Sequence, residues 1–304
     1  METDLFTSTP WYYTIEVEKG VFTTGRERRN MALTRRLLRN VQVRGIDCID
    51  IGTQEAVVPI LLKKAGAGRM VAYDRVDLTR KVEALRTVYQ MDFDYVCGFP
   101  LHELPTQLQQ RGEPSTYDLV VLSGVLYHSI NPLGLLALVR GLCRAGGLLL
   151  IETAALQNPK ELLIFNAGGK VYGPTSNYFI PTTAWLDYVL RMLGLMPLEA
   201  IYFGEMQEEG LMRLALLCRS MRGPCPLNPE DSWVFKGFHA NAFLSESHLK
   251  WTNIESKRGE LGYAPYDDDR VLTLSNQSLY QRLRGHPRYV SQKHEGILTL
   301  DATM

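Results

Sequence analysis

Residues 46–53, IDCIDIGT, form a short apolar run that stops at a glycine. A helical segment is expected at residues 57–64, and a second apolar run, residues 69–74 (RMVAYD), ends on an acid. A strand, a glycine turn, a helix and a strand that ends in an acid form the first half of a nucleotide-binding βαβ unit. The two runs therefore predict a parallel sheet with a ligand beyond the carboxyl ends of its strands.

The turn that follows the first strand is poor in glycine. A dinucleotide site favours G-x-G-x-x-G, because glycines let the backbone approach a pyrophosphate. Here Gly52 is followed by Thr53-Gln54-Glu55-Ala56. A single glycine and the acidic Glu55 suit a ligand without phosphates, such as S-adenosylmethionine. Asp74 lies about 20 residues beyond the turn, where an acid can bind a ribose hydroxyl. Gly52 and Asp74 are thus expected to contact this cofactor.

Composition narrows the classes of function. The 304 residues include 33 basic and 33 acidic side chains, so the zero net charge gives no global field that would attract nucleic acid. No stretch approaches the roughly 20 apolar residues of a membrane span, and the N-terminus lacks the pattern of a signal peptide. The five cysteines are scattered without C-x-x-C spacing. A cytoplasmic protein without membrane contact or structural metal is predicted.

The remaining pattern alternates strands with helices. Further strands are expected at residues 93–97, 117–123, 148–153, 198–203 and 211–219, and helices at residues 26–40, 78–90, 101–111, 132–144 and 182–193. Such alternation predicts a parallel α/β sheet, and the final hairpin would append an antiparallel strand. Residues 154–181 interrupt the rhythm and are expected to be a long functional loop.

The chain is expected to have three parts. Residues 1–44 would form a strand and helix cover, residues 45–220 the cofactor-binding domain, and residues 221–304 an extension of unknown role. Residues 11–17 fit an edge strand or a lid over the cofactor. The arginines of the helix at 26–40 fit a solvated face or a phosphate-binding face. The aromatic-rich extension fits an appendage folded on the main domain or part of a homodimer contact.

Three later stretches carry a resemblance to a known family. They are SGVLYH (123–128) with NPL (131–133), LIET (150–153) and NYFIP (177–181). In their order and spacing the chain resembles a class I S-adenosylmethionine-dependent methyltransferase, whose Rossmann-like sheet has seven strands, the last antiparallel. Within that class it is similar to relatives of the bacterial tRNA wobble-uridine carboxymethyltransferase, over about residues 10–220.

The resemblance implies positions around the cofactor. Gly52 and its neighbours would face the methionine part, and Asp74 would bind the ribose. Gly98 and Phe99, after the third strand, would flank the adenine. Ser123 and Tyr127 match positions at the sulfonium end.

Other candidates come from the chemistry of the residues themselves. His128 lies just past the fourth strand and could act as a general base, or it could cap the loop. Tyr127 is a second catalytic candidate that could also hydrogen-bond the cofactor, or it could simply bury its ring. Asp50 and Glu55 flank the glycine turn, and one could accept a hydrogen bond from the cofactor's amino group. Either could instead be an acid favoured by a helix start.

Residues beyond the fourth strand are candidates for the acceptor pocket. Asn177 and Tyr178 could line it from the long loop, or Asn177 could form a local turn. Glu152, at the end of the fifth strand, could contact substrate or a neighbouring arginine. The remaining histidines lack metal-ligand spacing, so no metal is assigned.

These observations predict a methyltransferase that acts on the oxygen or nitrogen of a small molecule, as in secondary metabolism. Two alternatives stay open. One is transfer of a methyl or carboxymethyl group to a tRNA wobble uridine, for which a carboxylated form of S-adenosylmethionine would be the donor. The other is a non-catalytic protein that binds S-adenosylmethionine.

Overall fold

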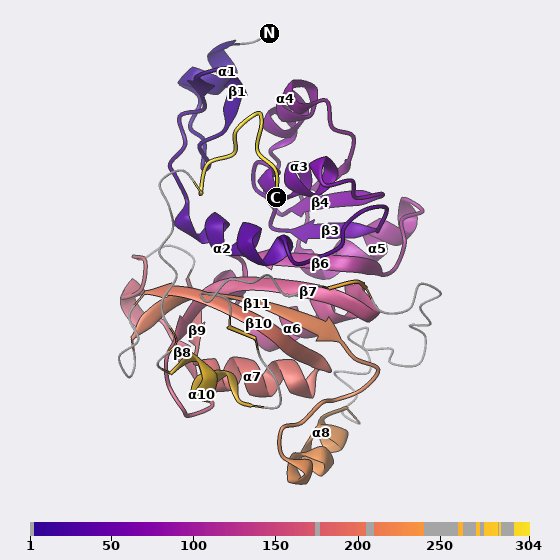
Figure 1. Cartoon of the computed structure of the whole chain (residues 1–304), viewed down its shortest axis with the longest axis vertical. Helices are drawn as coiled ribbons and strands as arrows, with labels where there is room; N and C mark the ends of the chain where they lie inside the picture. The colour runs from indigo at the N-terminus through magenta and orange to yellow at the C-terminus, as the bar shows by residue number, and fades with distance from the viewer. Residues whose placement is uncertain are drawn as a thin grey trace.

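A single central sheet organises the chain (Figure 1). The computed structural model describes residues 3–173, 177–204, 210–239, 261–263, 272–273, 277–284, 286 and 295–304. In these residues the strand order is β12-β10-β11-β7-β6-β3-β4-β5. The bounds are β3 (Cys48–Ile51), β4 (Met70–Asp74), β5 (Asp94–Cys97), β6 (Tyr117–Ser123), β7 (Cys143–Leu156), β10 (Leu195–Gly204), β11 (Leu211–Ser220) and β12 (Leu272–Thr273).

The direction of the strands confirms the predicted class of fold. The strands β5, β4, β3, β6 and β7 are mutually parallel, whereas β11 runs antiparallel to both β7 and β10. Without the two-residue β12, this is a seven-stranded, mostly parallel sheet with an antiparallel last strand. Residues Tyr117–Leu122 of β6 are all buried, as expected of a central strand that is covered on both faces.

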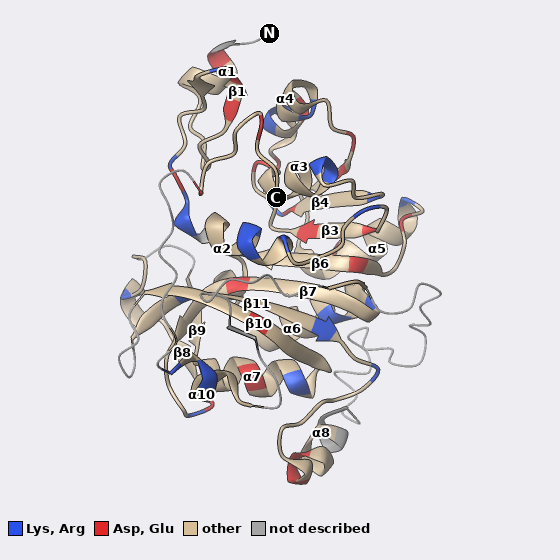
Figure 2. Ribbon diagram, viewed as in Figure 1, with Lys and Arg blue, Asp and Glu red and all other residues tan. Residues whose placement is uncertain are grey.

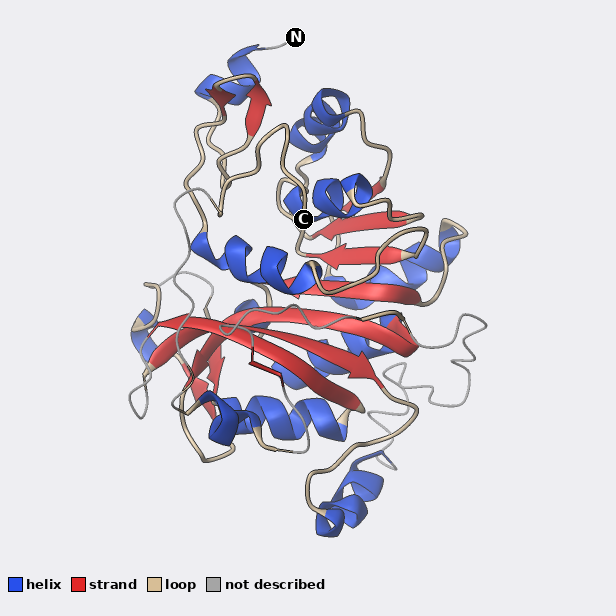
Figure 3. Ribbon diagram, viewed as in Figure 1, coloured by secondary structure: helices blue, strands red, loops and turns tan. Residues whose placement is uncertain are grey.

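Helices cover the two faces of the sheet (Figure 3). Apolar residues of α2 (Arg29–Leu38), α3 (Val57–Lys64) and α4 (Thr79–Tyr89) share one core cluster, and those of α5 (Leu104–Gln110), α6 (Pro132–Leu142) and α7 (Thr183–Met192) share the other. The start of α6 follows from its sequence, since Pro132 takes the first position and Asn131 accepts a hydrogen bond from the Gly134 amide at 3.0 Å.

Two expectations from the sequence were wrong. The helix expected at residues 132–144 and the strand expected at 148–153 are differently bounded: α6 ends at Leu142, and β7 already begins at Cys143 and passes through Gly146-Gly147 with a shift of register. A Cβ atom on Gly147 would lie 2.7 Å from the Asp118 carbonyl oxygen, so close strand packing is the reason for a glycine there. The segment 154–181 is not all loop, because it contains the hairpin of β8 (Leu163–Phe165) and β9 (Phe179–Pro181).

The two ends of the chain pack together. The N-terminal segment contains α1 (Thr3–Ser8) and the hairpin of β1 (Glu16–Glu18) and β2 (Val21–Phe22). The last residues run alongside it, with the Glu16 amide donating to the Leu298 carbonyl at 2.8 Å (Figure 1). The described end of the extension is therefore folded on the rest of the chain. Residues 240–260 of the expected extension lie outside the described residues.

Basic residues of α2 and α3 bind this C-terminal tail. Figure 2 marks basic residues along α2. Arg35 of this helix donates to the carbonyl oxygens of Glu295, Ile297 and Thr303 at 3.0–3.1 Å. Lys64 of α3 donates to the Ala302 carbonyl at 3.2 Å. Arg35 therefore has a structural role, which differs from both alternatives given for the arginines of this helix, a solvated face and a phosphate-binding face.

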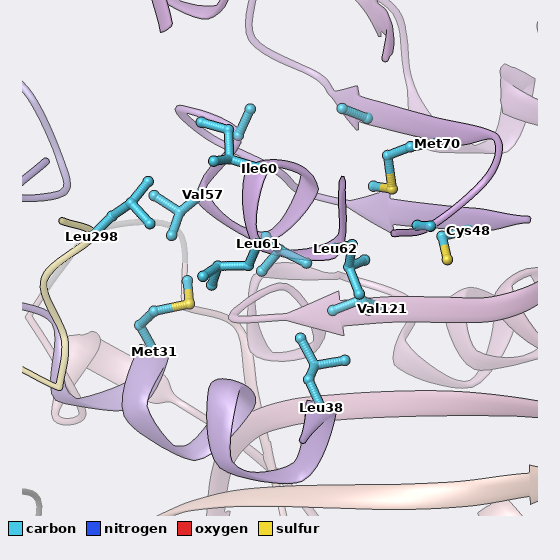
Figure 4. Close-up of a cluster of buried hydrophobic side chains, with 14 of the residues drawn as sticks. Met31, Leu38, Cys48, Val57, Ile60, Leu61, Leu62, Met70, Val121 and Leu298 are labelled. Atoms are coloured by element: carbon cyan, nitrogen blue, oxygen red, sulfur yellow. The ribbon is translucent and has the colours of Figure 1, made fainter. Parts of the chain in front are cut away.

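The tail also contributes to the core. Leu298 is 1% exposed and lies near Met31 of α2 and Val57 of α3, in the cluster that continues through Leu61 to Val121 of β6 (Figure 4). Burying such a side chain contributes about 1.5–3 kcal/mol. The tail is thus part of the folded domain.

Replacement of Leu298 by alanine should lower the free energy of unfolding by about 2–5 kcal/mol, because it removes buried methyl groups and leaves a cavity. Urea denaturation followed by circular dichroism measures this change. Ile130→Ala, at a side chain that is 75% exposed, is the control and should change the unfolding free energy by less than about 0.5 kcal/mol. Equal stability of Leu298→Ala and wild type would show that the tail is not bound as described.

Candidate functional site

The turn after β3 lies at the carboxyl edge of the sheet and has an unusual backbone. Gly52 has φ +79°, and a Cβ atom there would lie 2.3 Å from Cγ2 of Val125, in the segment after β6. Gln54 and Ala56 also have positive φ, 50° and 57°. The turn therefore keeps a left-handed backbone at alternate positions, although only the first of them is a glycine.

Asp74, at the end of β4, closes this turn. One carboxylate oxygen accepts from the Gln54 amide at 2.8 Å and the other from the Val76 amide at 2.9 Å. Burial raises the pKa of Asp74, and these backbone hydrogen bonds oppose the rise. A carboxylate offers about four lone-pair sites, so these two bonds leave room for ligand hydroxyls. The geometry thus fits the expected ribose contact.

Asp50 places a second carboxyl group at the same edge. It is buried in β3, and burial raises its pKa to about 7, which the Thr53 hydroxyl opposes and the charge of Asp74 increases. None of the ion pairs between described residues includes Asp50. A cationic ligand group beside two acids in such a place would favour their ionised forms. The donor set therefore fits the ammonium and ribose groups of S-adenosylmethionine.

Glu55 has contacts that the sequence did not predict. Its oxygens accept from the amides of Tyr12 at 2.8 Å and Tyr13 at 3.3 Å, and Lys81 of α4 lies 3.2 Å away. Lys81 also donates to the Pro10 carbonyl at 2.6 Å. Glu55 thus accepts from the N-terminal segment and from Lys81, two residues before α3 begins. It is a buried anchor that holds the N-terminal segment against the glycine turn.

Tyr13 is the residue of that segment most closely surrounded by acids. Its side chain is buried, and burial raises its pKa well above the ordinary value, with the charges of Asp50, Glu55 and Glu152 adding to the effect. The segment 11–17, expected to be an edge strand or a lid, thus lies beside the glycine turn. Its last residues belong to the strand β1 (Glu16–Glu18), and both alternatives stay open.

Gly98 and Phe99 follow β5, next to the end of β4. Gly98 has φ +85°, and its conformation rather than crowding requires glycine, since a Cβ atom there would meet nothing within 4 Å. The Phe99 ring lies 5.3 Å from the ring of Tyr73, whose hydroxyl donates to the Phe99 carbonyl at 2.7 Å. The edge beside Asp74 is therefore aromatic, as an adenine neighbour would be.

The ends of β6 and β7 hold a buried ion pair. Arg213 of β11 donates from Nε and Nη2 to the two oxygens of Glu152, at 2.6 and 2.5 Å. Ser123 lies 3.5 Å from one of these oxygens, and its hydroxyl is 2.9 Å from that of Thr34. Of the two alternatives for Glu152, the structure shows the arginine contact. The sequence could not reveal Arg213, because its partner lies on a different strand.

Tyr127 lies directly above this pair. The guanidinium of Arg213 is 4.8 Å from the centre of the Tyr127 ring, and burial raises the pKa of Tyr127 while Arg213 opposes the rise. The exposed ring of His128 lies 4.3 Å from that of Tyr127, on the short helix η2 (Leu126–His128). The amide of Tyr178 donates to the Tyr127 carbonyl at 2.8 Å. The structure therefore brings the candidates of the long loop beside those of the fourth strand.

Asn177 precedes Tyr178 in the same segment. Its backbone carbonyl accepts a hydrogen bond from Asn166 Nδ2 at 3.0 Å.

Within the described residues, no cluster of three or more histidine, cysteine or acidic side chains could hold a metal ion. No described helix is long and apolar enough to cross a membrane.

Comparison with known proteins identifies the family. The profile of a family described as a methyltransferase domain matches residues 22–187, which is more than half of the chain. The chain belongs to this methyltransferase family. The match includes the glycine turn, Asp74, and the segment from Ser123 to Asn177.

Curated relatives of this methyltransferase are tRNA U34 carboxymethyltransferases. That of Pseudoalteromonas translucida is 26% identical over 171 residues, covering 52% of this chain and 48% of the relative, and that of Pseudoalteromonas atlantica is 31% identical over 94 residues, covering 31% and 29%. The chain therefore spans about half the length of such relatives or less. The N-terminal domain of EvdMO1, crystallised with S-adenosylhomocysteine and D-fucose, is 15% identical with a TM-score of 0.52, over 69% of this chain and 91% of that one. This likeness shows the shared fold.

Substitution of Gln54 should distinguish a strained turn from a relaxed one. Gln54→Gly should raise the unfolding free energy of the methyltransferase by about 0.5–1 kcal/mol, because glycine adopts positive φ without steric cost. Gln54→Val should lower it by at least about 1 kcal/mol, because a β-branched side chain disfavours that conformation. Urea titrations of the three proteins measure the differences. The reverse order of stability would contradict the left-handed turn.

Asp50 should make stability depend on pH. A carboxyl whose folded pKa is raised to about 7 favours the folded state below the unfolded pKa and loses that contribution as pH rises through about 4 to 7. Asp50→Asn should therefore match wild type near pH 3.5, below the unfolded pKa, and be more stable by about 1–4 kcal/mol near pH 8. Denaturant midpoints of the ligand-free proteins at the two pH values give the comparison. A difference that does not change with pH would place Asp50 in a solvated environment.

Proposed function

We propose that this methyltransferase transfers a methyl group from S-adenosylmethionine to an oxygen or nitrogen of a small molecule, in secondary metabolism. The observation that carries the proposal is the juxtaposition of two sites at one edge of the sheet. Asp50 and Asp74 lie at the glycine turn, and the Tyr127 ring lies at the end of the neighbouring strand β6. This arrangement can align a donor with an acceptor.

We assign the cofactor contacts as follows. Asp74 accepts from the ribose hydroxyls, Asp50 from the amino group, and Gly52 gives the methionine part room to approach the backbone. Gly98 and Phe99 flank the adenine, and Ser123 and Tyr127 face the sulfonium end. Bound S-adenosylmethionine supplies an electrophilic methyl group. Glu55 is left out of this set because the N-terminal segment and Lys81 occupy its oxygens.

Other residues of the protein orient the two reactants and shield them from water. The tyrosines of the N-terminal segment exclude water from the turn, which alignment of the two reactants requires. His128, exposed just past β6, can accept a proton from an oxygen or nitrogen acceptor. Asn177 and Tyr178 border the acceptor from the side of the hairpin. The proposed division of the chain is a cover at 1–44, a cofactor-binding domain at 45–220 and an extension at 221–304.

A tRNA acceptor is the second candidate, since the curated relatives are named for tRNA U34. The charge distribution favours the small molecule. The net charge is zero, and Arg213, the cation that faces Tyr127, already makes two hydrogen bonds to Glu152. A carboxylated donor or a phosphate backbone would need a cation whose charge is not already paired. Ordinary S-adenosylmethionine therefore fits this site better than its carboxylated form.

A labelling experiment tests the assignment. The protein is incubated with S-adenosylmethionine labelled in its methyl group, together with either a low-molecular-mass metabolite extract or bulk tRNA. Label recovered in the small-molecule fraction alone is the expected result. Label in tRNA would favour the second candidate, and binding without any transfer would leave a non-catalytic binding protein.

Asp74→Ala should weaken binding of S-adenosylhomocysteine at least tenfold, about 1.4 kcal/mol, because a charge-assisted hydrogen bond is lost. Isothermal titration calorimetry measures the affinity. Asp74→Asn, which can still accept from the turn, controls for loss of fold and should also bind more weakly. Asp92→Ala removes a surface acid that is 97% exposed and should bind like wild type. Wild-type affinity in both Asp74 variants would remove this residue from the site.

A further inference from the structure

A cavity of about 510 Å³ lies between three helices of the structure. Residues of α7, of α8 (Ser232–His239) and of α10 (Leu279–Leu283) line it, together with residues that flank them. The helix α10 lies beside α7 (Figure 1). Binding sites for small molecules have volumes of roughly 300–1,000 Å³. None of the described residues that line this cavity is among those proposed above for the cofactor or the acceptor.

Two residues of α7 form a buried ion pair in the wall of the cavity. Arg191 Nε donates to one carboxylate oxygen of Asp187 at 2.8 Å, and the Leu279 amide donates to the other at 3.0 Å. Asp187 is 3% exposed and Arg191 is 4% exposed. The pair therefore joins α10 to α7, and both oxygens of the Asp187 carboxylate are occupied.

The guanidinium of Arg191 is only partly satisfied by this pair. Its Nη2 atom is buried and makes no hydrogen bond to a described residue. Arg191 differs in this from Arg213, whose Nε and Nη2 both donate to Glu152. A buried donor without an acceptor is costly, so an oxygen atom that reaches it is favoured. Because Arg191 lines the cavity, a bound molecule can supply that oxygen.

Three further charged groups line the cavity, namely Arg284, Glu161 and Asp231. None of them belongs to an ion pair between described residues. Burial raises the pKa of Tyr188, and the charges of Asp231 and Glu161 add to the rise, so both acids lie near its side chain. The wall thus offers cationic groups to a carboxylate and acidic groups to an ammonium.

Aromatic side chains form the apolar part of the wall. The rings of Tyr188 and Phe235 are 5.1 Å apart in an edge-to-face arrangement, and Phe235 is 1% exposed. Tyr280 of α10 lines the same cavity. We call Tyr188, Phe235 and Tyr280 the aromatic wall. A further ring that packs against such a wall gains both apolar burial and edge-to-face contact.

We propose that this cavity is a binding site for a zwitterionic aromatic amino acid or a small molecule of the same chemistry. The carboxylate of this ligand would accept from Arg191 and Arg284, and its ammonium would donate to Glu161 and Asp231. Its ring would lie against the aromatic wall. The inference goes beyond the proposed function, because binding here requires neither the cofactor nor the methyl acceptor.

Three probes that differ by one charged group test the class of ligand. L-phenylalanine carries both charges, 2-phenylethylamine lacks the carboxylate, and 3-phenylpropanoate lacks the ammonium. Isothermal titration calorimetry of the full chain measures their affinities. We expect L-phenylalanine to bind at least tenfold more tightly than either of the other two. Saturating S-adenosylhomocysteine should leave its affinity unchanged, because the cavity lies outside the proposed cofactor site.

Variants of the wall test the two ends of the ligand separately. Arg191→Lys keeps a cation that can pair with Asp187 but has no second guanidinium nitrogen, and it should weaken L-phenylalanine binding at least fivefold. Asp231→Asn should weaken it by a similar factor. Glu230→Gln is the matched control, since Glu230 is an exposed acid next to Asp231 that does not line the cavity. It should bind L-phenylalanine like wild type.

Circular dichroism melts establish that each variant is folded. If Arg191→Lys does not fold, Arg284→Gln replaces it, because Arg284 is exposed and lines the same cavity. Absence of L-phenylalanine binding, equal binding of the three probes, or wild-type affinity in the wall variants would each overturn the inference. Competition between L-phenylalanine and S-adenosylhomocysteine would also overturn it, since the amino acid would then occupy the cofactor site.

Discussion

The site depends on the hydrogen bond from the Gln54 amide to the Asp74 carboxylate. It joins the turn after β3 to the end of β4, and the parallel pairing of these strands brings both to one edge. A left-handed turn with glutamine and alanine in place of glycine is strained, so it needs such a tether. The two backbone hydrogen bonds hold the Asp74 carboxylate in a fixed position at the edge of the sheet where we propose that the cofactor binds. The structure of the turn and the proposed binding of the cofactor thus share one acid.

Both chain ends reinforce this edge. Glu55 anchors Tyr12 and Tyr13 over the turn, and Lys81 of α4 ties the same segment down. Behind the segment, the C-terminal tail pairs with β1 and inserts Leu298 between α2 and α3. The N-terminal segment is therefore a packed part of the domain, in which residues near the two ends of the chain stabilise each other.

On its other side the site changes character. The turn is acidic and buried, while the region of Tyr127 is aromatic, and the charges of Arg213 and Glu152 beside it compensate each other. This division fits the chemistry of the proposed donor, because a sulfonium amino acid carries positive charge. Methyl transfer needs the methyl donor and the acceptor atom in line. The ends of β3 and β6 are adjacent, so a donor bound at the glycine turn and an acceptor bound at Tyr127 would meet there.

Hydrophobic patterning and local chemistry in the sequence determined the parallel sheet, the antiparallel final hairpin, and the positions of Gly52, Asp74 and Tyr127 at strand ends. These features depend on neighbours within one βαβ unit, so a local pattern suffices to predict them. The start of β7 was missed because Gly147 is required by its close approach to Asp118 on another strand, which no local pattern reveals. Only the tertiary structure decided that Glu55 holds the N-terminal segment, that Glu152 pairs with Arg213, and that Leu298 belongs to the core. Each of those contacts joins residues at least 40 positions apart in the chain, and no local pattern encodes a partner at such a distance.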